Sequence, residues 1–256
     1  MKNYFLTLLL LSTFCSLAQT YEGTIGKHQI ILELHLNSEN QAASAVYFYK
    51  SKLKNIALDG SYVNSELILF EHFSEQEDKK ELFKLSKNKA TFSGTWQNQD
   101  IVLDVKLTKT SKTLEAYKLS KLELVRDSIS TFGGKELVWF TELFSKQRLF
   151  RLGNGFTASQ RNFLNPKLDS IHSGYALIDL ECNFAEVSIK IQLISSQYIS
   201  FSEYTSTYCG GAHPNYGISG YNFDIKNNLT LQGLTDLYPN LDHYKIIEHK
   251  YKHTDN

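Results

Sequence analysis

The stretch Tyr208-Cys209-Gly210-Gly211-Ala212-His213-Pro214-Asn215 decides the fold of the second half of this chain. Two adjacent glycines ahead of a proline favour a tight bend, because glycine adopts positive φ at little cost and lets backbones approach closely. An apolar-alternating run, residues 187–208, precedes the bend, and a strand-like segment, residues 219–224, follows it. We therefore predict two antiparallel strands that lead into the bend, after which the chain recrosses the same sheet.

The segments on either side extend this prediction. Residues 154–173 have helical spacing, with Thr157 as the N-cap residue. Pro166 is predicted to divide this helix in two, and Gly174 to end it. Strands are then expected over residues 175–182 and 186–194. In the second of these strands the residues predicted to share one face are Val187, Ile189, Ile191 and Leu193.

Beyond the bend, Asn227-Asn228 is typical of a turn that tolerates positive φ, and residues 231–238 are predicted to start a helix. Between the two halves of the chain, residues 119–125 are expected to form a strand. Gly133-Gly134 is predicted to lie in a turn, and residues 136–149 fit either a helix or a strand.

The bend and the pattern after it resemble the RsiV-like domain of unknown function. The matching residues are Tyr208-x-Gly210-Gly211-Ala212-His213-Pro214-Asn215, Asn222-x-Asp224, Leu229-Thr230-Leu231 and Leu234-x-Asp236-Leu237. This domain occurs in secreted bacterial proteins, forms the extracellular part of lysozyme-sensing anti-sigma factors, and accompanies some peptidoglycan deacetylases. The resemblance covers residues 150–240 and implies an antiparallel sheet with helices packed on it. Such domains continue past this point into further strands, which implies a shortened copy or an incomplete sequence here.

The first half of the chain has the pattern of an antiparallel β-domain. Ile30, Leu32, Leu34 and Leu36 alternate with the residues between them, and turn signals such as Asp59-Gly60 recur every 8 to 12 residues. We predict an α+β protein: an antiparallel barrel or sandwich over residues 19–108, a linker over 109–115 and the RsiV-like domain over 116–256. The first half also resembles a β-domain of bacterial envelope proteins. The residues that carry this likeness are Tyr21-x-Gly23, Ile25-Gly26, Tyr47-x-Tyr49, Leu58-x-Gly60 and Gly94-Thr95-Trp96.

Residues 1–18 have the organisation of a signal peptide. Lys2 supplies the positive charge, residues 5–11 form the apolar segment, and Ser16 and Ala18 occupy the −3 and −1 positions before Gln19. A lipid anchor on Cys15 is not expected, because the bulky Phe14 precedes it. We therefore expect a periplasmic or secreted protein. No later apolar stretch reaches the roughly 20 residues that span a bilayer.

Composition and missing motifs narrow the function. Lys plus Arg and Asp plus Glu both number 27, so the chain lacks the basic excess of a nucleic-acid-binding protein. A nucleophile elbow, a P-loop, a dinucleotide glycine fingerprint and a Cys-x-x-Cys pair are all absent from the sequence. The acidic metal-binding motif of polysaccharide deacetylases is absent too. We expect no cofactor and no metal.

Cys182 and Cys209 are the two cysteines that remain after removal of the signal peptide. An even count in an exported protein permits a disulfide, and both residues lie in or beside predicted strands. A bond between them would join the start of the hairpin to the Gly-Gly bend. Two buried, reduced thiols are the alternative.

His213 is the residue that best separates the candidate functions. It could act as a general base or as a ligand, with Asp224 or Asp236 as its partner, or it could hold backbone groups in the bend before Pro214. Asn222 and Asp224 are expected to fix turns through hydrogen bonds to the backbone. We expect a non-catalytic envelope protein that binds a protein or a cell-wall glycan, and the resemblance nominates lysozyme. A hydrolase of cell-wall material that uses His213 is the alternative. The residues taken as a binding or structural motif are Tyr208, Gly210, Gly211, Ala212, His213, Pro214, Asn215, Asn222, Asp224 and Asp236.

Overall fold

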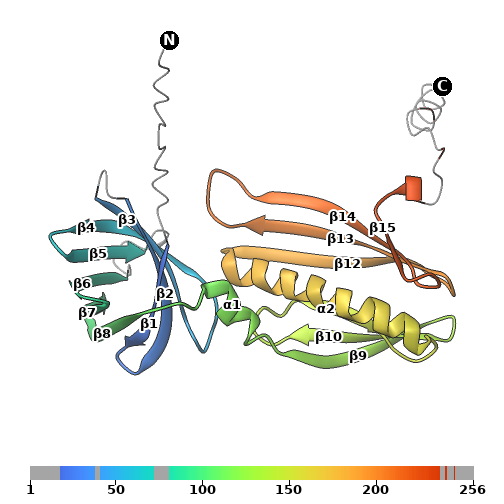
Figure 1. The fold of residues 1–256 in the computed structure, drawn as a ribbon, viewed down its shortest axis with the longest axis horizontal. Coiled ribbons are helices and arrows are strands. Elements are labelled where there is room, and N and C mark those ends of the chain that lie inside the picture. Colours follow the sequence, from blue (N-terminus) through green and yellow to red (C-terminus); the bar gives the residue numbers. More distant parts are fainter. Residues whose placement is uncertain (1–17, 38–40, 72–80, 237–239, 241–244, 246–256) are drawn as a thin grey trace, which may run out of the picture. The chain divides into compact units, whose positions relative to one another are not determined.

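The computed structural model describes residues 18–37, 41–71, 81–236, 240 and 245. The chain divides into two compact units, with the boundary between Tyr117 and Lys118 (Figure 1). The predicted signal peptide, except for Ala18, lies outside the described residues. So does nearly all of the chain after Asp236, including the region where the resemblance implies further strands.

The first unit is a closed, eight-stranded antiparallel barrel, in which each strand pairs with the next and β1 pairs with β8. The antiparallel β-domain predicted from the alternating pattern is therefore a barrel and not a sandwich. Closure leaves no strand edge exposed. The strands are β1 (Gln19–Ile25), β2 (His28–Leu36), β3 (Ala42–Tyr49), β4 (Ile56–Val63), β5 (Glu66–Glu71), β6 (Leu82–Asn88), β7 (Thr91–Asn98) and β8 (Ile101–Thr110).

Three glycines allow the barrel strands to approach closely. A Cβ atom on Gly23 or Gly60 would lie 1.8 Å from a carbonyl oxygen of the neighbouring strand, and one on Gly94 would lie 2.0 Å from such an oxygen. These distances are far below van der Waals contact, so no other residue fits without a backbone shift. The inward-facing side chains form one apolar core, which includes Tyr21, Leu32, Tyr47, Leu69 and Phe92.

The segment predicted as a linker, residues 109–115, is largely structured. Residues 109 and 110 end β8, and helix α1 (Leu114–Leu119) begins at residue 114. Only residues 111–113 lie outside regular structure. The strand expected over residues 119–125 begins later, at Leu124, because α1 ends at Leu119 and a turn closed by hydrogen bonds to Lys118 O follows it.

The second unit contains two antiparallel sheets and one long helix, α2 (Ala158–Glu181) (Figure 1). The smaller sheet has the strand order β11-β10-β9, so the ambiguous residues 136–149 belong mainly to strands. The larger sheet has the order β12-β13-β14-β15. Its strands are β12 (Phe184–Ile194), β13 (Tyr198–Tyr208), β14 (Asn215–Asp224) and β15 (Leu229–Leu231), and those of the smaller sheet are β9 (Leu124–Phe132), β10 (Lys135–Glu142) and β11 (Arg148–Leu152).

One apolar core joins these elements. Leu164, Leu168 and Tyr175 of α2 lie in the same buried cluster as Phe150 of β11 and Phe201 of β13. The rings of Phe150 and Phe201 meet edge to face, with their centroids 5.3 Å apart. The second unit is thus built around α2 and the faces of strands from both sheets.

Three predictions about the segment that forms helix α2 are wrong: the break at Pro166, the end at Gly174 and the strand over residues 175–182. The helix begins after Thr157, which forms a capping box with Gln160 as the sequence indicates, but it runs through Pro166 and Gly174 into the segment predicted as a strand. The reason is a spacing of four that continues to the end of the helix. Its buried members are Leu164, Leu168, His172, Ala176 and Leu180.

The four-residue period is hard to recognise in the sequence because one of its members, His172, is polar. Ala176, Ile178 and Leu180 are spaced by two, which is also the pattern of a strand. At Pro166, where the helix lacks one backbone donor, the preceding Asn165 anchors it. The Asn165 Oδ1 accepts from Leu152 N (2.8 Å), and its Nδ2 donates to Leu152 O (3.2 Å).

The larger sheet differs from prediction in three places. Strand β14 begins at Asn215, four residues earlier than expected. Leu231 ends β15 instead of starting a helix, and the helical turn that follows is a short 3-10 turn at Leu234–Asp236. A register shift between Ile191 and Leu193 turns Leu193 away from the core face, so this residue is 47% exposed.

Candidate functional site

The Gly-Gly bend has the backbone conformation that the sequence predicts. Gly210 and Gly211 have φ angles of 96° and 102°. A Cβ on Gly211 would meet no atom within 4 Å, so its glycine is required by conformation and not by crowding. The Tyr208 hydroxyl donates to Gly211 O (3.0 Å), and Cys209 is disulfide-bonded to Cys182. The expected pairing of the two cysteines is therefore present.

His213 lies on the surface of this bend. Its side chain is exposed, and its Nδ1 lies 3.2 Å from the carbonyl oxygen of Pro214. The flanking Ala212 and Asn215 are exposed as well. No carboxylate is hydrogen-bonded to His213 among the described residues, so its observed contact is with backbone only.

Asp224, at the other end of β14, holds a turn together. Its Oδ1 accepts from the backbone N–H groups of Lys226 (3.1 Å) and Asn227 (3.0 Å). Its Oδ2 accepts from the side chains of Asn227 (2.8 Å) and Gln197 (3.3 Å). Burial alone would raise the pKa of Asp224, but these hydrogen bonds outweigh burial and hold the pKa below its usual range.

Asn222 and Asp236 have different roles. The Asn222 Oδ1 accepts from the Ser200 hydroxyl (2.6 Å), so Asn222 joins two strands and does not bind the backbone of a turn. The Asp236 Oδ2 accepts from the N–H groups of Gln232 and Gly233, and so closes the turn after β15. The predicted turn-fixing role is confirmed for Asp224 and wrong for Asn222.

The structure does not bring His213 together with either aspartate. His213 precedes β14 and Asp224 ends it, and ten strand residues at about 3.4 Å each span roughly 34 Å. Contacts at the two ends of α2 also indicate that His213 and Asp224 lie far apart. The bend is bonded to Cys182 at the C-terminus of α2, whereas Asn228, just past Asp224, contacts Ser159 in its first turn. A His213–carboxylate catalytic pair with Asp224 is therefore absent.

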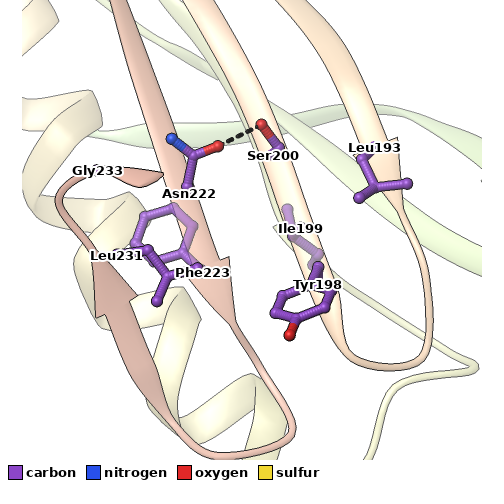
Figure 2. A pocket seen from close by; sticks show the side chains of 8 residues that line it. All are labelled: Leu193, Tyr198, Ile199, Ser200, Asn222, Phe223, Leu231 and Gly233. Atoms are coloured by element: carbon purple, nitrogen blue, oxygen red, sulfur yellow. Dashed lines mark hydrogen bonds between the residues drawn. The ribbon is translucent and has the colours of Figure 1, made fainter. Parts of the chain in front are cut away.

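A pocket of about 310 Å³ lies where β15 joins the larger sheet (Figure 2). Ser200 and Asn222, joined by their hydrogen bond, lie across from each other on β13 and β14. The remaining lining is apolar or aromatic. The full set is Leu193, Tyr198, Ile199, Ser200, Asn222, Phe223, Leu231 and Gly233.

The pocket lining contains no carboxylate, histidine, lysine or arginine. General acid–base catalysis needs a titratable group within hydrogen-bond reach of substrate, and the Tyr198 phenol is the only such group here. The Tyr198 oxygen accepts from Gln197 Nε2 (2.8 Å). An apolar hollow with a few polar groups is typical of a binding site for a small neutral ligand.

A second hollow of about 390 Å³ lies on the other side of the β14–β15 pair. It is bounded by Lys167, Ser170 and Ile171 of α2, and it shares Asn222, Phe223 and Leu231 with the first pocket. Asn222 therefore borders both hollows. Among the predicted motif residues it alone lines either of them.

Most of the pocket residues were not predicted. The sequence places Leu193 on the core face, and only the register shift in β12 brings it to the pocket. Ser200 is an ordinary strand serine until β14 places Asn222 opposite it. A signal that could have revealed the site is the alternation of β13, which puts Tyr198 and Ser200 on the face opposite the buried Ile199 and Phe201.

Comparisons with known proteins add no assignment: no family model and no curated protein matches this chain. Among the described residues no helix is both long and apolar enough to cross a bilayer. The same residues contain no group of three or more His, Cys, Asp or Glu side chains arranged to hold a metal ion.

Proposed function

We propose that this chain is an exported, non-catalytic protein of the bacterial envelope, and that its RsiV-like α+β domain binds a cell-wall glycan. The signal-peptide pattern and the motif around His213 support export and the family. The observation that carries binding over catalysis is the pocket of Figure 2, which is concave and lined without charge. The separation of His213 from Asp224 removes support from the hydrolase alternative.

The chemistry of the pocket favours a neutral sugar. Leu193, Leu231 and Tyr198 offer apolar surface for the C–H face of a saccharide ring or for an acetyl methyl group. The Asn222 Oδ1 is occupied by Ser200, which leaves the Asn222 amide N–H₂ to donate to a ligand carbonyl or hydroxyl. An uncharged N-acetylhexosamine unit of peptidoglycan combines these features, and the volume suits one or two sugar rings.

A calorimetric titration of residues 19–256 with N-acetylglucosamine oligomers tests this proposal. The wild type is expected to bind saturably, and Asn222→Ala is expected to weaken binding about tenfold through loss of the amide donor. The matched control is Asn215→Ala, the same change at an exposed site outside the pocket on the same strand. Lysozyme, nominated by the resemblance, is titrated in parallel.

Two outcomes contradict the proposal. If no wall oligomer binds, a cell-wall glycan is not the ligand. If lysozyme binds and the oligomers do not, the partner is a protein. Release of new reducing ends from purified peptidoglycan, lost on His213→Ala, would restore the hydrolase alternative.

A further inference from the structure

In the part of the chain that the structure describes, strand β14 has a free edge over residues 215–221. Strand β15 pairs only with Asn222, Phe223 and Asp224, so residues 215–221 have no strand on that side within the described part of the chain. Residues 215–220 are all exposed. On that side, every second residue of this stretch presents an N–H and a C=O group that can template pairing with another strand, while the alternate residues bond to β13.

Two other edge strands of this unit, β9 and β12, carry charges, whereas residues 215–221 carry none. Strand β9 has Arg126 and Asp127, and β12 has Glu186 and Lys190. Charged side chains of this kind protect an edge against unwanted pairing. Residues 215–221, by contrast, read Asn-Tyr-Gly-Ile-Ser-Gly-Tyr, with no charge, no proline and two large apolar side chains exposed to solvent.

We propose that two copies of this chain form a dimer by antiparallel pairing of residues 215–221, which joins their four-stranded sheets into one sheet of eight. A second copy is the favoured occupant because the segment complements itself about Ile218. With Ile218 on the two-fold axis, Tyr216 lies opposite Gly220 of the partner subunit, and Gly217 lies opposite Ser219 of the partner subunit. A large residue thus faces a glycine, and no like charges meet.

The dimer would cover the most exposed apolar side chains of the sheet. Tyr216 is 78% exposed and Ile218 is 77% exposed. Strand alternation places both on the same face as Tyr204, which lies directly across from Ile218 on β13. The pocket lies near the other end of β14, so pairing leaves it open, and the dimer does not depend on the proposed glycan binding.

Sedimentation of residues 19–256 over a wide concentration range tests the proposal. The wild type is expected to shift from monomer to dimer with rising concentration. Ile218→Lys places two ammonium groups together on the two-fold axis and should raise the dissociation constant at least about tenfold. The matched control is Ile129→Lys, the same change at a 45% exposed site on the edge strand β9.

A wild type that stays monomeric at every concentration overturns the proposal. So does an Ile129→Lys variant that weakens the dimer as much as Ile218→Lys. Binding of an extended peptide from another protein to residues 215–221 of a monomeric chain would assign the edge to a different occupant and count against the dimer.

The register has its own test. In Ile218→Cys the two new thiols lie across the axis at cross-strand distance and should form a disulfide-linked dimer under mild oxidation. In Gly220→Cys they lie four residues apart along the strands, roughly 14 Å, and should not. Gly220 accepts a side chain, since the nearest atom to its added Cβ would be 3.9 Å away. Crosslinking through Gly220→Cys alone would overturn the register and, with it, the pairing about Ile218.

Discussion

The Sγ of Cys182, the C-cap residue of α2, is bonded to the Sγ of Cys209, which follows β13. The bond attaches the Gly-Gly bend to the end of the helix and closes a loop with a sequence separation of 27. The paired change Cys182→Ser with Cys209→Ser should therefore lower the free energy of unfolding by about 3 to 4 kcal/mol on the chain-entropy model. Urea titration of both proteins measures this difference. Two reactive thiols in the denatured, unreduced wild type would contradict the bond itself.

The buried His172 should make the second unit sensitive to mild acid. Its Nε2 lies 2.8 Å from Gln147 O, an acceptor, and its Nδ1 lies 3.4 Å from an Arg151 nitrogen, a donor. These partners require the neutral ring with the proton on Nε2. Burial is the main cause that lowers the pKa of His172; Arg151 lowers it further, while the Gln147 hydrogen bond and the carboxylates of Glu142 and Asp169 act in the opposite direction.

Because the pKa of His172 is lower in the folded state, the unfolded chain binds the extra proton first. The contribution of neutral His172 to the free energy of unfolding is fully present above the ordinary histidine pKa of about 6.5 and decreases as the pH falls below it. Urea unfolding of Trp96→Phe, followed through Trp139, the tryptophan of the second unit, should show this loss between pH 7 and pH 5. In His172→Gln, which keeps a donor and an acceptor but does not titrate, the loss should shrink. An equal loss in both proteins would contradict this role.

Gly60 should tolerate no side chain. A Cβ at this position would lie 1.8 Å from Ile68 O on β5, so Gly60→Ala must displace a barrel strand. We expect a loss of about 3 kcal/mol or more of unfolding free energy, in the range of severe overpacking. Gly220→Ala, at an open strand position, is the control and should change stability by less than about 0.5 kcal/mol. Thermal unfolding of the two variants compares them, and equal melting temperatures would be the contrary result.

Asp224 should contribute stability that depends on its charge. Each of its oxygens accepts two hydrogen bonds. In Asp224→Asn an amide N–H₂ group, which is itself a donor, replaces one of these oxygens and faces two donors. A loss of about 1 to 3 kcal/mol is expected near neutral pH. Because the pKa of Asp224 is lowered by folding, its contribution is present above about pH 4 and declines as the pH falls further. When unfolding free energy is measured against pH, the curves of Asp224→Asn and the wild type should converge in acid. The control Asp100→Asn, at an exposed site, should show no such loss near neutral pH.

His213 should be dispensable for both folding and binding. It is exposed, and its hydrogen-bond contact among the described residues is with Pro214 O. His213→Ala is expected to change the unfolding free energy by no more than about 0.5 kcal/mol, as at other surface sites. Calorimetry should give the same glycan affinity as the wild type. Full stability with binding abolished would move the functional site to the bend.

Elements that depend on local chemistry could be predicted from the order of the residues. Two-residue alternation and turn signals predicted the antiparallel strands of residues 19–108, because side chains in a strand point to opposite faces. The glycines at 210 and 211 predicted a bend with positive φ, and Thr157 predicted the start of α2. Asp224 as a turn-fixing residue followed from its hydrogen-bonding reach.

Features that depend on partners distant in the chain appear only in the folded protein. Helix α2 runs past Pro166 and Gly174 because its every-fourth residues stay buried to its end, and Leu164, Leu168 and Tyr175 enter a core made by strands that lie before and after it in the chain. Leu193 lines the pocket because a register shift, set by pairing with β13, turns it outward. The Ser200–Asn222 pair exists because β14 lies beside β13, and His213 is separated from Asp224 because that strand is extended. None of these follows from local spacing, because each is set by which strand or helix packs against another.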